Sequence, residues 1–432
     1  MPEHDSKQPR DAAPDRASGF STRAIRAAHR APRVDQRPTS VPIYQTVTFS
    51  SDDAAELGSV LTDEQPGYAY SRIDNPTVTA LAAAVAELEG AEAGYALASG
   101  MAAIHGAVVS LVSTGDRIVA TRASYGTTRA LFSDILGRLG VTTAFVDMTD
   151  ANAVEAALVA APTRILYAET IANPTIVVAD HAALAEIAHR HGALYVVDNT
   201  FASPYLCRPL ELGADLVVES ATKFLSGHSD VLAGVVCGRS DLIDAIRTLQ
   251  VDTGASLAPN SAFLVLRGIS TLAIRMERHA ATAAALAAWL ERQAGVSHVY
   301  HPSLASHPQH EVAMRQLALG GGMLAFELAG GRRAGRAFID ALSIPELTAS
   351  LGSVFTMVVH PPSTTHRQLD DAALASAGIT AGLLRCSVGL EDLDDLVADF
   401  ERGLAAASAA TEPEAAATPT DTPPTAATPA SV

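Results

Sequence analysis

The stretch DHAALAEIAHRHGALYVVDN, residues 180–199, contains a complete helix–strand unit. Asp180 is a typical N-cap residue, and Gly192 is a typical residue just after the end of a helix. Between them the apolar residues recur at helical spacing, and the run LYVV that follows has the composition of a buried strand. A helix that leads at once into a fully apolar strand is typical of α/β proteins.

The same alternation of helical and apolar segments recurs along the chain. Further strands are predicted at residues 94–98, 117–121, 165–168, 216–219 and 234–237. Each lies next to a helical pattern. We therefore predict an α/β fold with a large mixed, mostly parallel sheet that helices cover on both faces.

The chain is long enough for a large domain and a smaller partner. By composition its 432 residues divide into an N-terminal tail (1–19), an irregular arm (20–75), a large domain (76–273), a smaller α+β domain (274–410) and a C-terminal Thr/Pro/Ala tail (411–432). Neither tail can bury enough apolar surface to fold, so we expect both to be disordered. In the smaller domain we expect a long helix from about residue 274, a strand at 323–328 and a last helix through residues 393–404.

Charge and cysteine content exclude several classes of function. A formal net charge of −17 without any Lys/Arg run predicts that nucleic acid is not a partner. No uncharged apolar run is long enough to cross a bilayer, so no membrane association is expected. The cysteines, Cys207, Cys237 and Cys386, are far apart and form no C-x-x-C pair. They predict neither disulfides nor a metal site, and they fit a cytoplasmic location.

The run VVESATK, residues 217–223, places two hydroxyls and a lysine directly after an apolar strand. Ligands of parallel α/β sheets bind at the carboxyl ends of the strands, so these residues are candidates for a site. The Lys223 amine can form a Schiff base with a carbonyl cofactor and can move a proton, while Ser220 and Thr222 can bind a phosphate. An isolated lysine at a strand end is more often a surface residue, so Lys223 needs support from other residues.

Two other strand ends supply that support. Asp198 ends an apolar strand, and a carboxylate there can keep a pyridine nitrogen protonated. Ser99, Gly100 and Met101 form the turn between a predicted strand and a helix, where N–H groups and the helix dipole can bind phosphate. Alone, each feature would also fit a cap or a tight turn. Together with Lys223 they indicate pyridoxal 5'-phosphate (PLP).

Two further residues complete the candidate site. Tyr125 follows the strand predicted at 117–121 and could stack on the cofactor ring, with its phenol as an acid–base group. Arg385 lies inside the apolar run LLRCSVG, residues 383–389. A guanidinium in such a run needs an anion, which either a substrate carboxylate or a protein carboxylate could supply.

In this order, the segments resemble the Cys/Met-metabolism family of PLP enzymes, which contains cystathionine γ-synthases, cystathionine and methionine γ-lyases and O-acylhomoserine sulfhydrylases. The resemblance runs from about residue 20 to about residue 410. Its matching stretches are YAYSR (68–72) with NPT (75–77), SGM (99–101), YG (125–126), Glu169 with NP (173–174), DNT (198–200), SATK (220–223), SLG (350–352) and Arg385 with SVG (387–389).

The resemblance implies a fold type I PLP enzyme, similar to aspartate aminotransferase, in which Lys223 carries the cofactor and Asp198 binds its pyridine nitrogen. The implied phosphate ligands are Ser99, Gly100, Met101, Ser220 and Thr222, with Tyr70 and Arg72 supplied by a neighbouring subunit. The arm at 20–75 would then cross into that subunit, within a homotetramer of two active dimers.

The remaining roles are implied in the same way. Tyr125 would stack on the cofactor ring and assist departure of the leaving group, and Asn173 would lie beside the phenolic oxygen of the cofactor. Arg385 would hold the α-carboxylate of an amino-acid substrate, with help from the backbone near Ser350 and Leu351.

The activity implied is γ-elimination from methionine, homocysteine or cystathionine, which yields a thiol, 2-oxobutanoate and ammonia. Stretch 320–328 is similar to methionine γ-lyases, yet these typically have Cys where this chain has Thr127. Cystathionine-handling members often have Glu where it has Ala349, and residues 362–366 resemble sulfhydrylases. The alternatives are therefore a γ-replacement synthase (cystathionine γ-synthase or O-acylhomoserine sulfhydrylase) and a PLP-binding protein without turnover.

Overall fold

The computed structural model describes residue 22, residues 37–365, residue 374 and residues 378–411. The predicted tails lie outside this range except for Thr411, as do residues 20–21 and 23–36 of the predicted arm. The chain forms two compact units. The first takes residues up to Asn173, then Val177–Glu277 and Glu311–Leu319, and the second takes Pro174–Ile176, Arg278–His310 and the residues from Gly320 onward.

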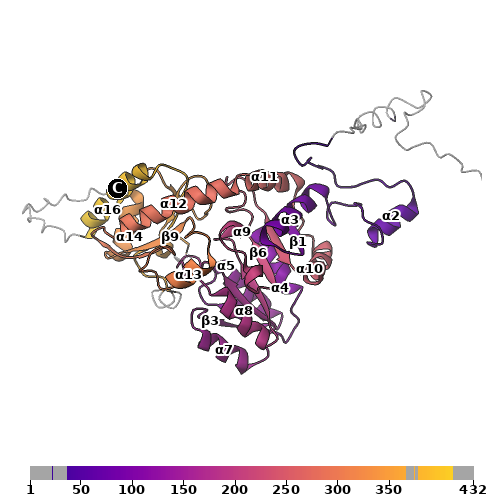
Figure 1. Cartoon of the computed structure of the whole chain (residues 1–432), viewed down its shortest axis with the longest axis horizontal. Helices are drawn as coiled ribbons and strands as arrows, with labels where there is room; N and C mark the ends of the chain where they lie inside the picture. Colours follow the sequence, from indigo (N-terminus) through magenta and orange to yellow (C-terminus); the bar gives the residue numbers. More distant parts are fainter. Residues whose placement is uncertain (1–21, 23–36, 366–373, 375–377, 412–432) are drawn as a thin grey trace, which may run out of the picture. The chain divides into compact units, whose positions relative to one another are not determined.

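The first unit is built around a seven-stranded sheet (Figure 1). Its strands are β1 (Ala93–Leu97), β2 (Arg117–Thr121), β3 (Thr142–Val146), β4 (Ile165–Glu169), β5 (Leu194–Asp198), β6 (Leu216–Glu219) and β7 (Gly234–Gly238). They lie in the order β1-β7-β6-β5-β4-β2-β3. Neighbours are parallel from β6 through β3, whereas β7 is antiparallel to both β1 and β6. The predicted mixed, mostly parallel sheet is confirmed.

Helices cover both faces of this sheet, because successive side chains of each strand point to opposite faces. Ile165 and Tyr167 of β4 pack with helices α4 and α10 on one face, while Leu166 and Ala168 pack with α7 and α8 on the other. The helices of the first unit are α2 (Ala54–Leu61), α3 (Pro76–Glu89), α4 (Gly100–Val109), α5 (Gly126–Ala130), η1 (Leu131–Ile135), α6 (Leu136–Arg138), α7 (Ala151–Ala160), α8 (His181–Arg190), α9 (Ser203–Leu206), η2 (Pro209–Leu212), α10 (Ser240–Thr253) and α11 (Pro259–Ile269).

The helix–strand unit predicted at residues 180–199 forms as expected. Asp180 caps α8, and its carboxylate accepts a hydrogen bond from the Ala183 N–H at 3.4 Å. Gly192 follows the helix with a φ of 69°, which a glycine adopts without steric cost. β5 begins at Leu194 and runs to Asp198.

Strand β3 was missed in the sequence. Its run TTAFV starts with two threonines, and the strand lies at the end of the sheet order, next to β2 alone. Its residues are exposed or only partly buried, so the apolar signal that marks a central strand is weak there.

Residues 37–75 form an irregular arm around α2, indigo in Figure 1, that leads away from α3 and β1. Asp53 caps α2, and Thr48 and Tyr70 form an isolated antiparallel bridge. The arm exposes several apolar side chains, among them Val47, of which 59% is accessible. The arm therefore leaves apolar surface uncovered.

The second unit is an α+β domain with a five-stranded sheet in the order β10-β11-β12-β9-β8. These strands are β8 (Val296–Tyr300), β9 (Met323–Leu328), β10 (Glu346–Leu347), β11 (Met357–Val359) and β12 (Leu383–Ser387). The second unit also contains α12 (Leu272–Leu290) from Arg278 onward, α14 (Gly331–Asp340), η3 (Pro361–Ser363) and α16 (Leu393–Thr411). Helix α13 (His310–Gln316) belongs to the first unit from Glu311 onward. Phe326, Phe338 and Phe400 pack together in the core of the second unit, with centroids 5.3 Å apart for the two edge-to-face pairs that involve Phe338.

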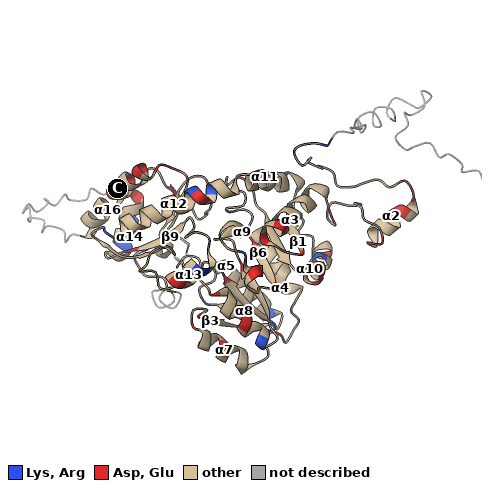
Figure 2. Ribbon diagram, viewed as in Figure 1, with Lys and Arg blue, Asp and Glu red and all other residues tan. Residues whose placement is uncertain are grey.

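Acidic and basic residues are scattered over the part of the chain that is described, and helices α8, α10 and α12 carry both kinds (Figure 2). No helix in that part is long and apolar enough to cross a membrane. The same residues contain no group of three or more His, Cys, Asp or Glu side chains that could hold a metal ion.

Candidate active site

Three parallel strands of the first unit, β4, β5 and β6, end in a carboxyl residue: Glu169, Asp198 and Glu219. Glu169 and Asp198 are register partners on neighbouring strands. We call these three strand ends, with the turns that follow them, the site edge. Parallel α/β sheets bind their ligands at such an edge.

Asp198 lies among hydrogen-bond donors at the centre of the site edge. Its carboxylate accepts the Thr200 N–H at 3.0 Å and the Tyr167 hydroxyl at 3.3 Å. Burial is the largest cause of its raised pKa, against the hydrogen bonds from Thr200. A cation placed beside this carboxylate, such as a protonated pyridine nitrogen, would favour the ionised form.

Glu169 joins two turns that carry predicted site residues. Its carboxylate accepts the Tyr125 N–H at 2.6 Å and the Asn173 N–H at 3.2 Å. Burial and the neighbouring Asp198 raise its pKa to about 8, although the two N–H groups oppose the shift. The sequence showed Glu169 only as part of a family motif. The signal that could have found this contact is an acid at the end of a fully buried strand.

The turn at Ser99 and the turn after β6 approach each other closely. Ser99 caps α4 through a 3.1 Å hydrogen bond from the Ala102 N–H. A Cβ on Gly100 would lie 2.6 Å from both Cβ and Oγ of Ser220, so only glycine allows this approach. The first N–H groups of a helix, here those of Gly100 and Met101, have no acceptor within the helix. Together with the Ser220 hydroxyl, they suit a phosphate group.

Thr222 contacts the backbone. Its hydroxyl donates to the Ala233 carbonyl at 3.2 Å and accepts the Ala233 N–H at 3.0 Å. These bonds pin the turn after β6 to the segment before β7. Lys223 follows in the same turn, half-buried, with its N–H bonded to the Ser220 carbonyl at 3.0 Å.

Lys223 is one of only two lysines in the chain, and the other is Lys7. A Schiff base in a protein needs the amine of a lysine side chain or of the N-terminus. A lysine, a turn suited to a phosphate group and a carboxyl group at one edge of the sheet fit PLP.

Tyr125, whose N–H contacts Glu169, is the residue directly before α5, and 45% of its surface is exposed. Its ring is therefore accessible for stacking. In the arm, the Arg72 guanidinium lies 5.6 Å from the centre of the Tyr70 ring and donates to the Val251 carbonyl of the same subunit. The structure thus places Tyr70 and Arg72 beside each other.

The predicted carboxylate-binding residues lie in the second unit. Arg385, on β12, is 4% exposed, and its Nη2 donates to the Ser350 carbonyl at 2.8 Å. Leu351 follows in the same loop and is also 4% exposed. The Gly352 N–H, bonded to the Ser387 hydroxyl at 2.8 Å, ties this loop to β12. The structure therefore brings Arg385, Ser350 and Leu351 together as one group.

Comparison with known proteins identifies a family of enzymes that depend on PLP. The family model of Cys/Met metabolism PLP-dependent enzymes matches residues 21–405. The chain is 47% identical over 392 residues to an L-methionine gamma-lyase from Pseudomonas putida, with 90% of this chain and 98% of that protein covered. It is 43% identical over 389 residues to an O-succinylhomoserine sulfhydrylase from Pseudomonas aeruginosa, with 90% and 96% covered.

A solved structure from Campylobacter jejuni, assigned as an O-acetylhomoserine (thiol)-lyase, superimposes with a TM-score of 0.82 at 32% identity. The match covers 87% of this chain and 97% of that one. One lysine of that protein carries a pyridoxyl phosphate group.

Proposed function

Because the chain belongs to the Cys/Met-metabolism family of PLP-dependent enzymes, we propose that it is a carbon–sulfur lyase that performs γ-elimination on a sulfur amino acid. The substrate is methionine, homocysteine or cystathionine. The reaction breaks the Cγ–S bond, releases the sulfur as a thiol (or as hydrogen sulfide from homocysteine), and consumes one water to give 2-oxobutanoate and ammonia.

The cofactor is PLP. When bound, it draws electrons from the substrate Cα and so acidifies the protons at Cα and then at Cβ. The observation that carries the proposal is the position of Lys223, which is the only lysine within the matched residues 21–405. Lys223 is therefore the residue to which we assign the cofactor and the movement of both protons.

The other residues receive roles that follow from their chemistry. Asp198 holds the pyridine nitrogen, and Ser99, Gly100, Met101, Ser220 and Thr222 serve the phosphate. Tyr125 stacks on the ring and donates its phenol proton to the departing sulfur, while Asn173 lies beside the phenolic oxygen. The Arg385 guanidinium binds the substrate carboxylate, with Ser350 and Leu351 shaping the loop beside it.

We also propose a cytoplasmic homotetramer. The exposed apolar side chains of the arm, including Val47, support a partner subunit that covers them. Tyr70 and Arg72 would then reach the phosphate group bound by that partner. The three cysteines are buried free thiols, as a reducing compartment allows.

A second candidate is γ-replacement, in which a thiol or sulfide adds where elimination releases the keto acid. The 43% identity to the O-succinylhomoserine sulfhydrylase favours it, as does the stretch PSTTH at residues 362–366. Both reactions use the same residues up to departure of the γ substituent.

The test is a substrate panel run on wild type and on Lys223→Ala. L-methionine, L-homocysteine and L-cystathionine are each incubated with the enzyme, and 2-oxobutanoate is assayed. A lyase forms the keto acid without any added thiol. Formation of product from O-succinylhomoserine plus sulfide, with no keto acid from the panel, would establish replacement. A visible cofactor band that no amino acid shifts would favour a binding protein without turnover.

A further inference from the structure

Two acidic residues lie buried directly behind the site edge. Glu89 is the last residue of α3, and Glu219 is the last residue of β6. Their exposed fractions are 0% and 1%. Each carboxyl group shifts the pKa of the other, with a side-chain hydrogen bond between them among the causes. A bond between two carboxyl groups requires a proton on one of them, because carboxylate oxygens only accept.

The surrounding donors do not supply that hydrogen. The Asn199 amide donates to Glu89 Oε1 at 3.0 Å. Glu89 Oε2 and Glu219 Oε1 are fully buried, and no described residue donates to either. Two ionised carboxylates in this position would carry a buried charge that no nearby cation compensates, and such a charge strongly destabilises a protein interior. Protonation removes that charge.

We propose that Glu89 and Glu219 stay protonated in contact with each other and act as a positioning pair for the cofactor site. Glu219 directly precedes Ser220, and Asn199, which Glu89 holds, directly follows Asp198. The pair therefore fixes the two turns that carry the phosphate-binding hydroxyl and the carboxylate for the pyridine nitrogen. This inference rests on the cofactor site proposed above and holds for elimination and replacement alike.

A continuous set of buried polar groups extends the pair to the third strand. The Asn199 amide also donates to the Cys207 carbonyl at 2.9 Å, and its oxygen accepts the Thr170 hydroxyl at 2.7 Å. Thr170 directly follows Glu169 and lies 3.1 Å from His181 Nε2. The ends of β4, β5 and β6 are thus joined on the side away from Asp198, since neighbouring residues of a strand point to opposite faces.

The charge around the pair is mostly negative. The groups that act electrostatically on the pair, or on which the pair acts, are Asp198 on β5, Cys207, Arg208 and Glu211 after α9, and Cys237 on β7. Arg208 is ion-paired with Glu211 at 3.2 Å. Burial raises the pKa of Glu89 to about 7 and raises that of Glu219 further. The stabilisation by the protonated pair is therefore fully present below the ordinary pKa of 4.5 and is lost as the pH rises, first through about 7 for Glu89 and then at higher pH for Glu219.

The experiment compares wild-type holoenzyme with Glu219→Gln, Glu219→Leu and the matched control Glu87→Gln, which removes an exposed acid from the same helix. Each full-length protein is dialysed without substrate at pH values from 6 to 9, and the retained cofactor is measured by its visible absorbance. The amide of Glu219→Gln replaces the carboxyl proton of Glu219 with a hydrogen that does not titrate.

We expect Glu219→Gln to bind the cofactor within about threefold of wild type at pH 6.5 and about tenfold better than wild type at pH 9, the factor that corresponds to one pKa unit. Glu219→Leu leaves Glu89 without its partner, so its affinity falls about tenfold or more at pH 6.5. Glu87→Gln follows wild type throughout.

Any one of three results would overturn the proposal. The cofactor affinity of Glu219→Gln could change with pH just as that of wild type does, or it could be tenfold weaker than wild type at pH 6.5. The cofactor affinity of Glu219→Leu could also equal that of wild type. If Glu219→Leu does not fold, the comparison of Glu219→Gln with wild type still decides. No substrate is present, so these results are independent of the lyase proposal. A failed 2-oxobutanoate assay would count against the lyase alone.

Discussion

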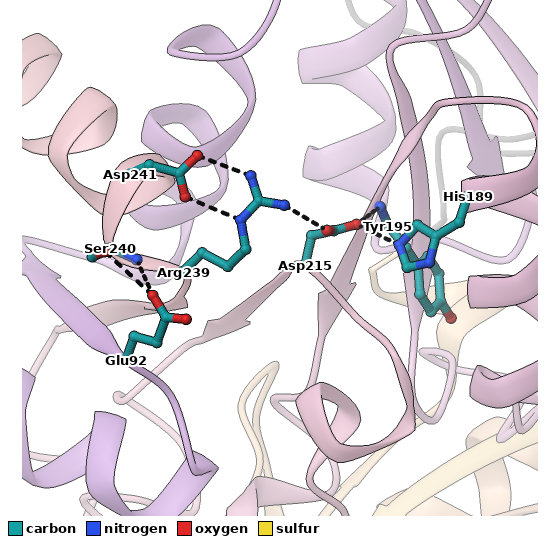
Figure 3. Close-up of polar contacts among 7 residues, drawn as sticks. All are labelled: Glu92, His189, Tyr195, Asp215, Arg239, Ser240 and Asp241. Atoms are coloured by element: carbon teal, nitrogen blue, oxygen red, sulfur yellow. Dashed lines mark hydrogen bonds and ion pairs between the residues drawn. The ribbon is translucent and has the colours of Figure 1, made fainter.

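The two edges of the sheet in the first unit use acidic residues in different ways. At the site edge, Glu169 and Asp198 are held by N–H and O–H donors, and burial raises their pKa values. The opposite edge, which we call the amino edge, contains Glu92, Asp215, Arg239 and Asp241 with the nearby His189 (Figure 3). There the acids meet basic side chains: Asp215 lies 3.3 Å from Arg239 and 2.9 Å from His189.

The difference separates structural acids from candidate functional acids. Asp215 also accepts the Tyr195 N–H at 2.8 Å, and Arg239 forms a two-pronged pair with Asp241 (Figure 3). Such pairs favour ionised carboxylates, and hydrogen bonding by Arg239 lowers the pKa of Asp241. Buried acids with raised pKa values cluster where a protein must stabilise charge that arrives with a ligand.

The largest expected effect comes from Lys223 at the site edge. Lys223→Ala removes the amine that bonds the cofactor and moves both protons, so kcat falls about a thousandfold or more. Treatment with borohydride should then fix no cofactor to the chain, as measured by mass spectrometry. Lys7→Ala is the control and should behave as wild type. Covalent labelling of Lys223→Ala would assign the cofactor to Lys7.

The next effect compares equivalent substitutions at the two edges. Asp198→Asn removes the carboxylate for the pyridine nitrogen, and we expect kcat to fall about a hundredfold or more, as for loss of one electrostatic partner in an active site. Asp215→Asn should instead lower the free energy of unfolding by about 1–2 kcal/mol through weakened charged hydrogen bonds. Its kcat should stay within about twofold of wild type. Loss of activity in Asp215→Asn without loss of stability would contradict the assignment of Asp215 as a structural acid.

A smaller effect is expected from Glu169. In Glu169→Gln an NH2 group replaces one of the two oxygens that accept the Tyr125 and Asn173 N–H groups, and because it cannot accept a hydrogen bond, kcat falls about tenfold. The pKa of Glu169, raised to about 8, means that its stabilisation is fully present below the ordinary value of 4.5 and is lost as the pH rises through about 8. The thermal midpoint of Glu169→Gln, measured between pH 5 and pH 9, should therefore fall less steeply than that of wild type. An identical slope would mean that Glu169 titrates normally.

The smallest effect is expected at the amino edge, with the opposite sign of pH dependence. The pKa of Asp241 is lowered, so its stabilisation is present above the ordinary value of 3.8 and is lost as the pH falls through the lowered pKa. Asp241→Asn should lower the thermal midpoint slightly at neutral pH in low salt, and not measurably in high salt, because the pair is exposed and screened. A large loss of stability in high salt would show that the pair is not screened.

The sequence predicted most of the first sheet and the α8–β5 unit, because the central strands are continuous apolar runs and Asp180 and Gly192 mark the helix ends. It also predicted the family, which the comparisons confirm. It did not predict β3, which lies at the sheet edge with a weak apolar signal, or the antiparallel placement of β7 between β1 and β6. Strand direction within a sheet depends on the connections between strands, and a run of apolar residues does not encode it.

Cofactor chemistry could be read from short segments, since Lys223, Asp198 and the Ser99 turn each follow an apolar strand within one local motif. Only the tertiary structure assigned Thr222 to the Ala233 backbone, Glu169 to the N–H of Tyr125, 44 positions away, and Asn199 to Glu89, 110 positions away. The reason is physical. A local pattern determines which strand a side chain follows, but the partner of a buried polar group depends on which distant segment the fold places within hydrogen-bond distance.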